Sequence, residues 1–196
     1  MGNRQGSRPS LTDEEVLQRF AKVVSKSLHI ESSQVTKDSY LDSLGAESLD
    51  FLEIALDTED EFNIAIPEKT ILDTAEEVFG EGVLVQDGIL TKEGRKFLIQ
   101  RMPELDVAQL GDPLTVEELN HIVSGVGAWV RMIKGLMEHT PTECPQCGAG
   151  LKNAVAGRFQ CAQCEAEVDV PSGDEINMRW VRGYYEKEYL PSQAGQ

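Results

Sequence analysis

Apolar residues recur at three- and four-residue steps along several stretches of this chain, which is the spacing of amphipathic helices. The first stretch begins at Thr12 or Asp13, two residue types that cap helices well, and continues to Leu28. Further helices are predicted at about 48–62, 73–79, 90–102, 115–137 and 176–189. The pattern therefore indicates a mainly α fold.

The predicted helix at 48–62 is strongly acidic and contains no basic residue. We expect its inward positions to be Leu49, Leu52, Leu56 and Phe62, with Ile54 and Ala55 on the flanks. Pro67 ends the segment that follows, because proline has no amide hydrogen to donate.

The longest apolar stripe extends from Leu119 to Met137 at helical steps. Gly125, Gly127 and Gly135 interrupt it, and glycine lowers helix propensity. We therefore expect one long helix with a kink or a close packing contact at these glycines.

The chain is acidic, with a formal net charge of −16 over 196 residues. Residues 1–87 hold 19 acidic and only 7 basic side chains, so the two halves differ in character. This balance argues against nucleic-acid binding and favours partners with a basic face. No apolar run is long enough for a transmembrane segment, and residues 1–10 have no signal-peptide core. We expect a cytoplasmic protein.

Ser48 stands in Leu44-Gly45-Ala46-Glu47-Ser48-Leu49-Asp50, directly before the acidic helix, and no catalytic partner lies near it in sequence. Some fifteen residues later comes Glu61-Phe62-Asn63-Ile64-Ala65-Ile66-Pro67. With the helix before them, these two blocks resemble the acyl carrier proteins over roughly residues 12–80. Glu47 replaces the aspartate that commonly precedes the serine in that family.

The resemblance implies a four-helix bundle whose serine, here Ser48, holds a covalent 4'-phosphopantetheine arm that carries acyl groups as thioesters. It also implies partners: a phosphopantetheinyl transferase, and acyl synthases, ketosynthases or acyl transferases with basic docking faces. The acids expected to contact them are Glu47, Asp50, Glu53, Asp57 and Glu61. The pathway would be fatty-acid, polyketide or specialised lipid synthesis.

All four cysteines occur in two Cys-x-x-Cys pairs, Cys144 with Cys147 and Cys161 with Cys164. Four thiolates complete a tetrahedral zinc site and leave no open position, so this spacing predicts a structural metal. The segment resembles a zinc ribbon with short β hairpins. Iron is the alternative metal, since ligand identity alone does not exclude it.

The predicted organisation is a tail at 1–11, a carrier domain at 12–87, a helical extension at 88–140, a zinc-ribbon module at 141–170 and an aromatic-rich helix and tail at 171–196. We expect a carrier and not an enzyme, because no residue set meets the needs of catalysis. Two alternatives stay open: a peptidyl or aminoacyl carrier, and an interaction protein of carrier fold without the arm.

Overall fold

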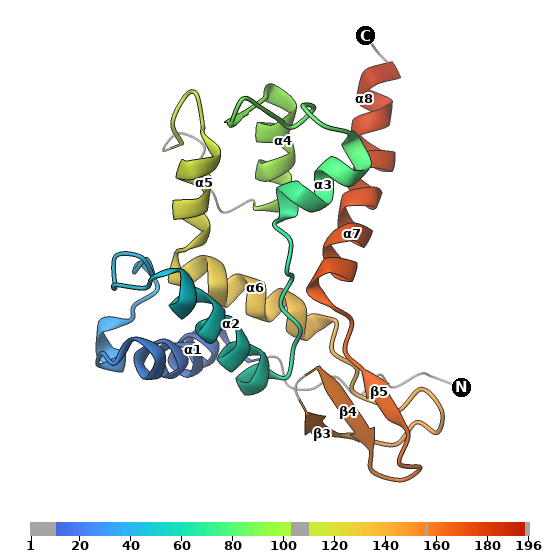
Figure 1. The fold of residues 1–196 in the computed structure, drawn as a ribbon. Coiled ribbons are helices and arrows are strands. Elements are labelled where there is room, and N and C mark those ends of the chain that lie inside the picture. The colour runs from blue at the N-terminus through green and yellow to red at the C-terminus, as the bar shows by residue number, and fades with distance from the viewer. Residues whose placement is uncertain (1–10, 103–109, 156, 195–196) are drawn as a thin grey trace. The chain divides into compact units, whose positions relative to one another are not determined.

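The computed structural model describes residues 11–102, 110–155 and 157–194, and the predicted tail at 1–11 lies almost entirely outside them. The fold is mainly helical with small antiparallel strands, as predicted (Figure 1). The helices are α1 (Asp13–Leu28), α2 (Ser48–Phe62), α3 (Ile71–Phe79), α4 (Lys92–Arg101), α5 (Val116–Val123), α6 (Val126–Glu138), α7 (Gly173–Tyr184) and α8 (Leu190–Ala194). The strands are β1 (Val85–Gln86), β2 (Ile89–Leu90), β3 (Leu151–Val155), β4 (Arg158–Cys161) and β5 (Glu167–Asp169). A 3₁₀ turn at Ser32–Gln34 and a π-helical turn at Tyr185–Tyr189 complete the set.

The chain forms two compact units, and each combines two separate segments. The first unit holds residues up to Ile66 together with Ser124–Gly173, and the second holds Pro67–Val123 together with the residues from Asp174 onward. The predicted consecutive modules, with boundaries at 87, 140 and 170, do not coincide with these units. The physical reason is that α6 packs its apolar face on α1, whereas α3 packs with α4, α5 and α7.

In the first unit, α1 begins where the sequence predicts, with Thr12 as its cap. The Thr12 hydroxyl accepts a hydrogen bond from the Glu15 amide at 3.2 Å, and the Glu15 carboxylate accepts one from the Thr12 amide at 2.8 Å. This reciprocal pair satisfies amides that the first helical turn otherwise leaves without a partner. The helix buries Val16, Phe20, Ala21, Val23, Val24 and Ser27.

Helix α6 is the second neighbour of α1 in this unit. Its Trp129 ring stacks on Phe20 with centroids 5.2 Å apart, and Lys134 pairs with Asp13. Its buried positions are Val126, Val130, Ile133 and Leu136. The helical segment predicted at 115–137 is two helices, because the chain breaks between Val123 and Val126 and the apolar stripe divides between the two units. The break includes Gly125, one of the glycines at which a kink or a close contact was expected.

The first unit also contains the small sheet, in the order β3-β4-β5, with both pairs antiparallel. The register places Phe159 of β4 opposite Asn153 and Val168. Phe159 is fully buried and, with the buried Cys161 and Val170, contributes an apolar centre to this sheet. The predicted short β hairpins at 141–170 are thus confirmed.

The second unit has its own core, formed by Leu72, Ala75, Phe79, Leu84, Leu90, Phe97, Leu98, Met102, Leu114, Leu119 and Val181. The Phe79 and Phe97 rings meet edge to face at 5.8 Å, and the C-terminal aromatics pack around them. Gly94 lies where a Cβ atom would be 2.0 Å from the Leu84 carbonyl oxygen. Only glycine therefore allows α4 to approach the chain before β1 this closely.

Candidate functional site

Ser48 is the first residue of α2 and is exposed. The helix start is fixed by Asp50, whose carboxylate accepts a hydrogen bond from the Glu47 amide at 2.7 Å. Gly45, in the loop before α2, has a φ of 98°. Residues other than glycine rarely adopt this backbone conformation. The sequence thus places a reachable hydroxyl on a rigid element, beside the positive end of the helix dipole.

The inward face of α2 differs from the prediction. Leu49, Leu52 and Leu56 are 81%, 59% and 55% exposed. The buried positions are Ile54, Thr58 and Phe62. These two stripes lie on nearly opposite sides of a helix with 3.6 residues per turn, and each alone fits a helical pattern. Periodicity within α2 does not choose between the two stripes, and packing on α1 decides which one is buried.

Of the five acids predicted to contact partners, three have partners within the chain. Asp50 holds the helix start, Asp57 pairs with Lys26 at 2.7 Å, and Glu61 pairs with Arg19 at 2.6 Å. The pKa of Lys26 is raised because Asp57 accepts its hydrogen bond. Glu47 and Glu53 are exposed. Sequence reasoning missed the α1–α2 pairs because they join residues far apart along the chain.

The four cysteine sulfurs come together, all within 4.8 Å of one another. The Sγ atoms of Cys147 and Cys161 are 3.4 Å apart, those of Cys147 and Cys164 are 3.6 Å apart, and those of Cys144 and Cys164 are 3.7 Å apart. Zinc–sulfur bonds of about 2.3 Å in a tetrahedron require sulfurs about 3.8 Å apart. The donor set and its spacing therefore fit a four-thiolate metal ion.

Both knuckles have the same backbone design. The Cys144 amide donates to the Ala149 carbonyl at 2.8 Å, and the Cys161 amide donates to the Ala166 carbonyl at 2.9 Å. The residue after each second cysteine has a positive φ: 74° at Gly148 and 59° at Glu165. Glycine suits this conformation, whereas glutamate adopts it against its usual preference.

The thiols differ in acidity because their surroundings differ. The amides of Cys164 and Gln163 donate to the Cys161 sulfur, each at 3.4 Å, and lower its pKa to about 6. For Cys164, the Ala166 amide lowers the pKa, but the sulfurs of Cys161 and Cys147 outweigh it and raise the value to about 12. Four thiols this close cannot all ionise without a cation between them.

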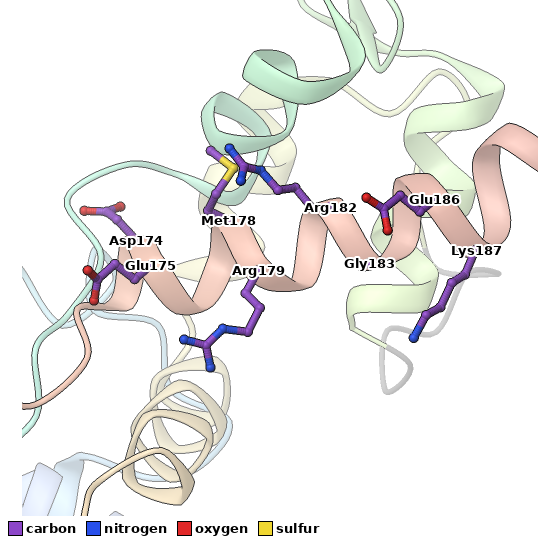
Figure 2. A pocket seen from close by; sticks show the side chains of 8 residues that line it. All are labelled: Asp174, Glu175, Met178, Arg179, Arg182, Gly183, Glu186 and Lys187. Atoms are coloured by element: carbon purple, nitrogen blue, oxygen red, sulfur yellow. The ribbon is translucent and has the colours of Figure 1, made fainter.

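A depression of about 730 Å³ runs along one face of α7 (Figure 2). Charges of both signs line it, with Arg179, Arg182 and Lys187 among the acids. It brings together no nucleophile and base, so we do not regard it as a catalytic site.

Within the described ranges, no helix has both the length and the apolar character that crossing a bilayer requires. The cytoplasmic location stays a prediction.

Comparison with known proteins defines the class first. Residues 18–78 match the family model described as "Phosphopantetheine attachment site", and residues 142–179 match one described as "Domain of unknown function (DUF8512)". No solved structure is significantly similar to the chain. The class is therefore that of carrier proteins with a phosphopantetheine attachment domain.

Curated relatives specify the family. The acyl carrier protein of Guillardia theta is 36% identical over 69 residues, which are 35% of this chain and 80% of the relative. Those of Prochlorococcus marinus (strain MIT 9515) and Lactobacillus johnsonii (strain CNCM I-12250 / La1 / NCC 533) are 40% and 36% identical, over 75% and 74% of their lengths and 30% of this chain in each case. The chain belongs to the acyl carrier protein family.

Proposed function

We propose that Ser48 carries a 4'-phosphopantetheine arm and that the protein transports acyl groups on it. The observation that carries this proposal is an exposed serine at the first position of α2, within the stretch that matches a phosphopantetheine attachment site. The arm supplies a terminal thiol that holds the cargo as a thioester. The protein then acts as a substrate for other enzymes rather than as a catalyst.

The residues around Ser48 fit a phosphodiester. The first backbone amides of a helix have no partner inside that helix, and together with the helix dipole they favour a negative group at this end. The hydroxyl is exposed, so a transferase can reach it. Asp50 keeps the helix start in place by its hydrogen bond to Glu47, which orders the attachment point before any arm is added.

The outer face of α2 would be the docking surface for the transferase and for acyl synthases, ketosynthases or acyl transferases. Leu49, Leu52 and Leu56 offer apolar contact area that this chain leaves exposed. Glu47 and Glu53 are exposed beside them and would attract a basic face. Charge complementarity of this kind speeds encounter and selects partners without requiring a long-lived complex.

The cargo belongs to fatty-acid, polyketide or specialised lipid synthesis in this proposal.

We further propose that Cys144, Cys147, Cys161 and Cys164 bind one structural zinc ion. The sulfur spacing and the absence of other donor types in the cluster support zinc or iron over harder cations. Binding of the ion by both knuckles would stabilise the fold of this small sheet.

The test of the carrier proposal is modification of the full chain by a phosphopantetheinyl transferase with coenzyme A, followed by intact-mass measurement. Wild type and the matched control Ser43→Ala, which removes an exposed serine from the loop before α2, should each gain one arm. Ser48→Ala should gain none. An unmodified wild type, or modification of Ser48→Ala, would refute the assignment. Acyl and aminoacyl donors then separate an acyl from a peptidyl carrier.

The docking surface has a separate test. Leu52→Asp should lower kcat/KM for arm transfer, whereas Leu190→Asp, which changes a leucine 46% exposed on α8, should not. Equal kcat/KM values for the two variants would show that the transferase does not use this face of α2.

A further inference from the structure

The loop that leads to Ser48 is held by residues 124–127, which belong to the same unit but lie far from the loop in sequence. The Val126 amide donates to the Ser39 carbonyl at 2.8 Å, and the Gly127 amide donates to the Lys37 carbonyl at 3.0 Å. In the other direction, the Leu41 amide donates to the Ser124 carbonyl at 3.2 Å. These backbone hydrogen bonds pair residues 37–41 with residues 124–127 in an antiparallel arrangement that includes a bridge between Tyr40 and Gly125.

The same loop continues from Leu41 to the attachment point through further hydrogen bonds. The Leu41 carbonyl accepts from the Leu44 amide at 3.1 Å and from the Ala46 amide at 2.9 Å. Leu41 is fully buried, so this turn has little freedom to shift. Ala46 directly precedes Glu47, the N-cap residue of α2, and Ser48 follows as the first residue of the helix. A continuous chain of contacts therefore joins residues 124–127 to the serine.

Residues 124–127 are themselves anchored by α6, which starts at Val126. Trp129 stacks on Phe20 of α1, and Val126, Val130 and Ile133 are buried. The contact at the helix start is close: a Cβ atom on Gly127 would lie 3.1 Å from the Lys37 carbonyl oxygen. Glycine at this position allows the two backbones to meet.

Residues 124–127 and the α6 side chains that anchor them lie outside the stretch matched by the attachment-site family, which ends at residue 78. We propose that residues 124–127 are a positioning segment for Ser48: they set the loop that presents the serine to the transferase. This inference rests on the proposed function of Ser48. It assigns to residues after the matched domain a direct part in carrier loading.

Two glycines of α6 provide a matched test. Gly127→Val introduces a branched side chain against the Lys37 carbonyl, whereas Gly135→Val makes the same change at a position where an added Cβ meets nothing within 4 Å. Small misplacements of a reacting group can cost up to about 100-fold in rate, so we expect Gly127→Val to lower kcat/KM for arm transfer about tenfold. Gly135→Val should stay near wild type, and Gly127→Ala should fall between.

A second measurement separates positioning from general destabilisation. Amide hydrogen exchange at Leu44 and Ala46 should accelerate in Gly127→Val but not in Gly135→Val, while amides inside α1 stay protected in both. If Gly127→Val fails to fold, Gly127→Ala carries the same comparison. Equal loading rates in the Gly127 and Gly135 variants would overturn the inference, whatever the exchange rates.

Failure of the proposed function is distinguishable from failure of the inference. If the wild type gains no arm, the carrier assignment fails, and the exchange experiment still decides whether residues 124–127 order the loop. If the wild type is loaded and Gly127→Val is loaded equally well, only the positioning role fails.

Discussion

Replacing Thr58 with valine should stabilise the first unit. Thr58 lies on the buried stripe of α2 between Ile54 and Phe62 and is fully inaccessible to solvent. Its Oγ1 atom has no hydrogen-bond partner within the described residues. Valine keeps the branched shape and replaces the unpaired hydroxyl with a methyl group. The substitution therefore removes a polar atom that folding strips of water without compensation.

The magnitude follows from the cost of that lost hydration. A buried donor or acceptor without a partner costs about 1–3 kcal/mol. The new methyl group is nearly the same size as the hydroxyl, so it fills the space with little steric strain to offset the gain in stability. We expect the free energy of unfolding of the first unit to rise by about 1–2 kcal/mol, which corresponds to roughly 2–8 °C in melting temperature for a protein of this length.

Urea denaturation followed by tryptophan fluorescence can measure this change in one unit at a time. Trp129 lies in the first unit and Trp180 in the second, so a Trp180→Phe background leaves Trp129 as the reporter. The matched control is Thr74→Val, read by Trp180 in a Trp129→Phe background. The Thr74 hydroxyl donates to the Thr70 carbonyl at 3.0 Å, so its loss should leave stability unchanged or lower it slightly. An unchanged or lower midpoint for Thr58→Val would refute the reasoning.

Three further predictions concern the helix start and the cysteine cluster. Asp50→Asn weakens the bond to the Glu47 amide and should lower the urea midpoint of the first unit by the equivalent of about 0.5–1 kcal/mol; an unchanged midpoint would contradict the capping role. Chelation should release one metal ion per chain and make four thiols reactive in a thiol titration, whereas reactive thiols before chelation would argue against the site. In the metal-free protein, ultraviolet absorbance should show one thiolate persisting down to about pH 6, because the amides of Cys164 and Gln163 lower the pKa of Cys161. The thiolate's contribution to folding stability should be complete above the ordinary thiol pKa of 9.0 and should be lost as the pH falls through about 6.

The extent of the helices could be predicted because capping residues and periodicity are local signals. The predicted helix at 48–62 matches α2 at both ends, and α1 begins after the predicted cap Thr12. The inward face of α2 could not be chosen from its own sequence, since two apolar stripes compete and only packing on α1 decides between them. The break between Val123 and Val126 has a similar origin, because tertiary contacts override a continuous apolar pattern.

The candidate site divides in the same way. Cysteine spacing was sufficient to predict a four-sulfur cluster, since each Cys-x-x-Cys turn is a local structure that presents two ligands to one ion. The ion pairs of Asp57 and Glu61 with α1 were not predictable, because they join residues 31 and 42 positions apart. A close contact at one of the glycines 125, 127 and 135 was expected, but its partner, the loop before Ser48, could not be predicted for the same reason.

The discontinuous first unit also has a consequence for biosynthesis. When α2 has just emerged from the ribosome, the nascent chain already contains Ser48. It still lacks α6, whose Trp129 stacks on Phe20, and residues 124–127, which pair with residues 37–41. About sixty residues of the second unit are synthesised before α6 emerges. The contacts of residues 124–127 with the loop before Ser48 can form only after that, so the order of synthesis delays them until most of the chain has been made.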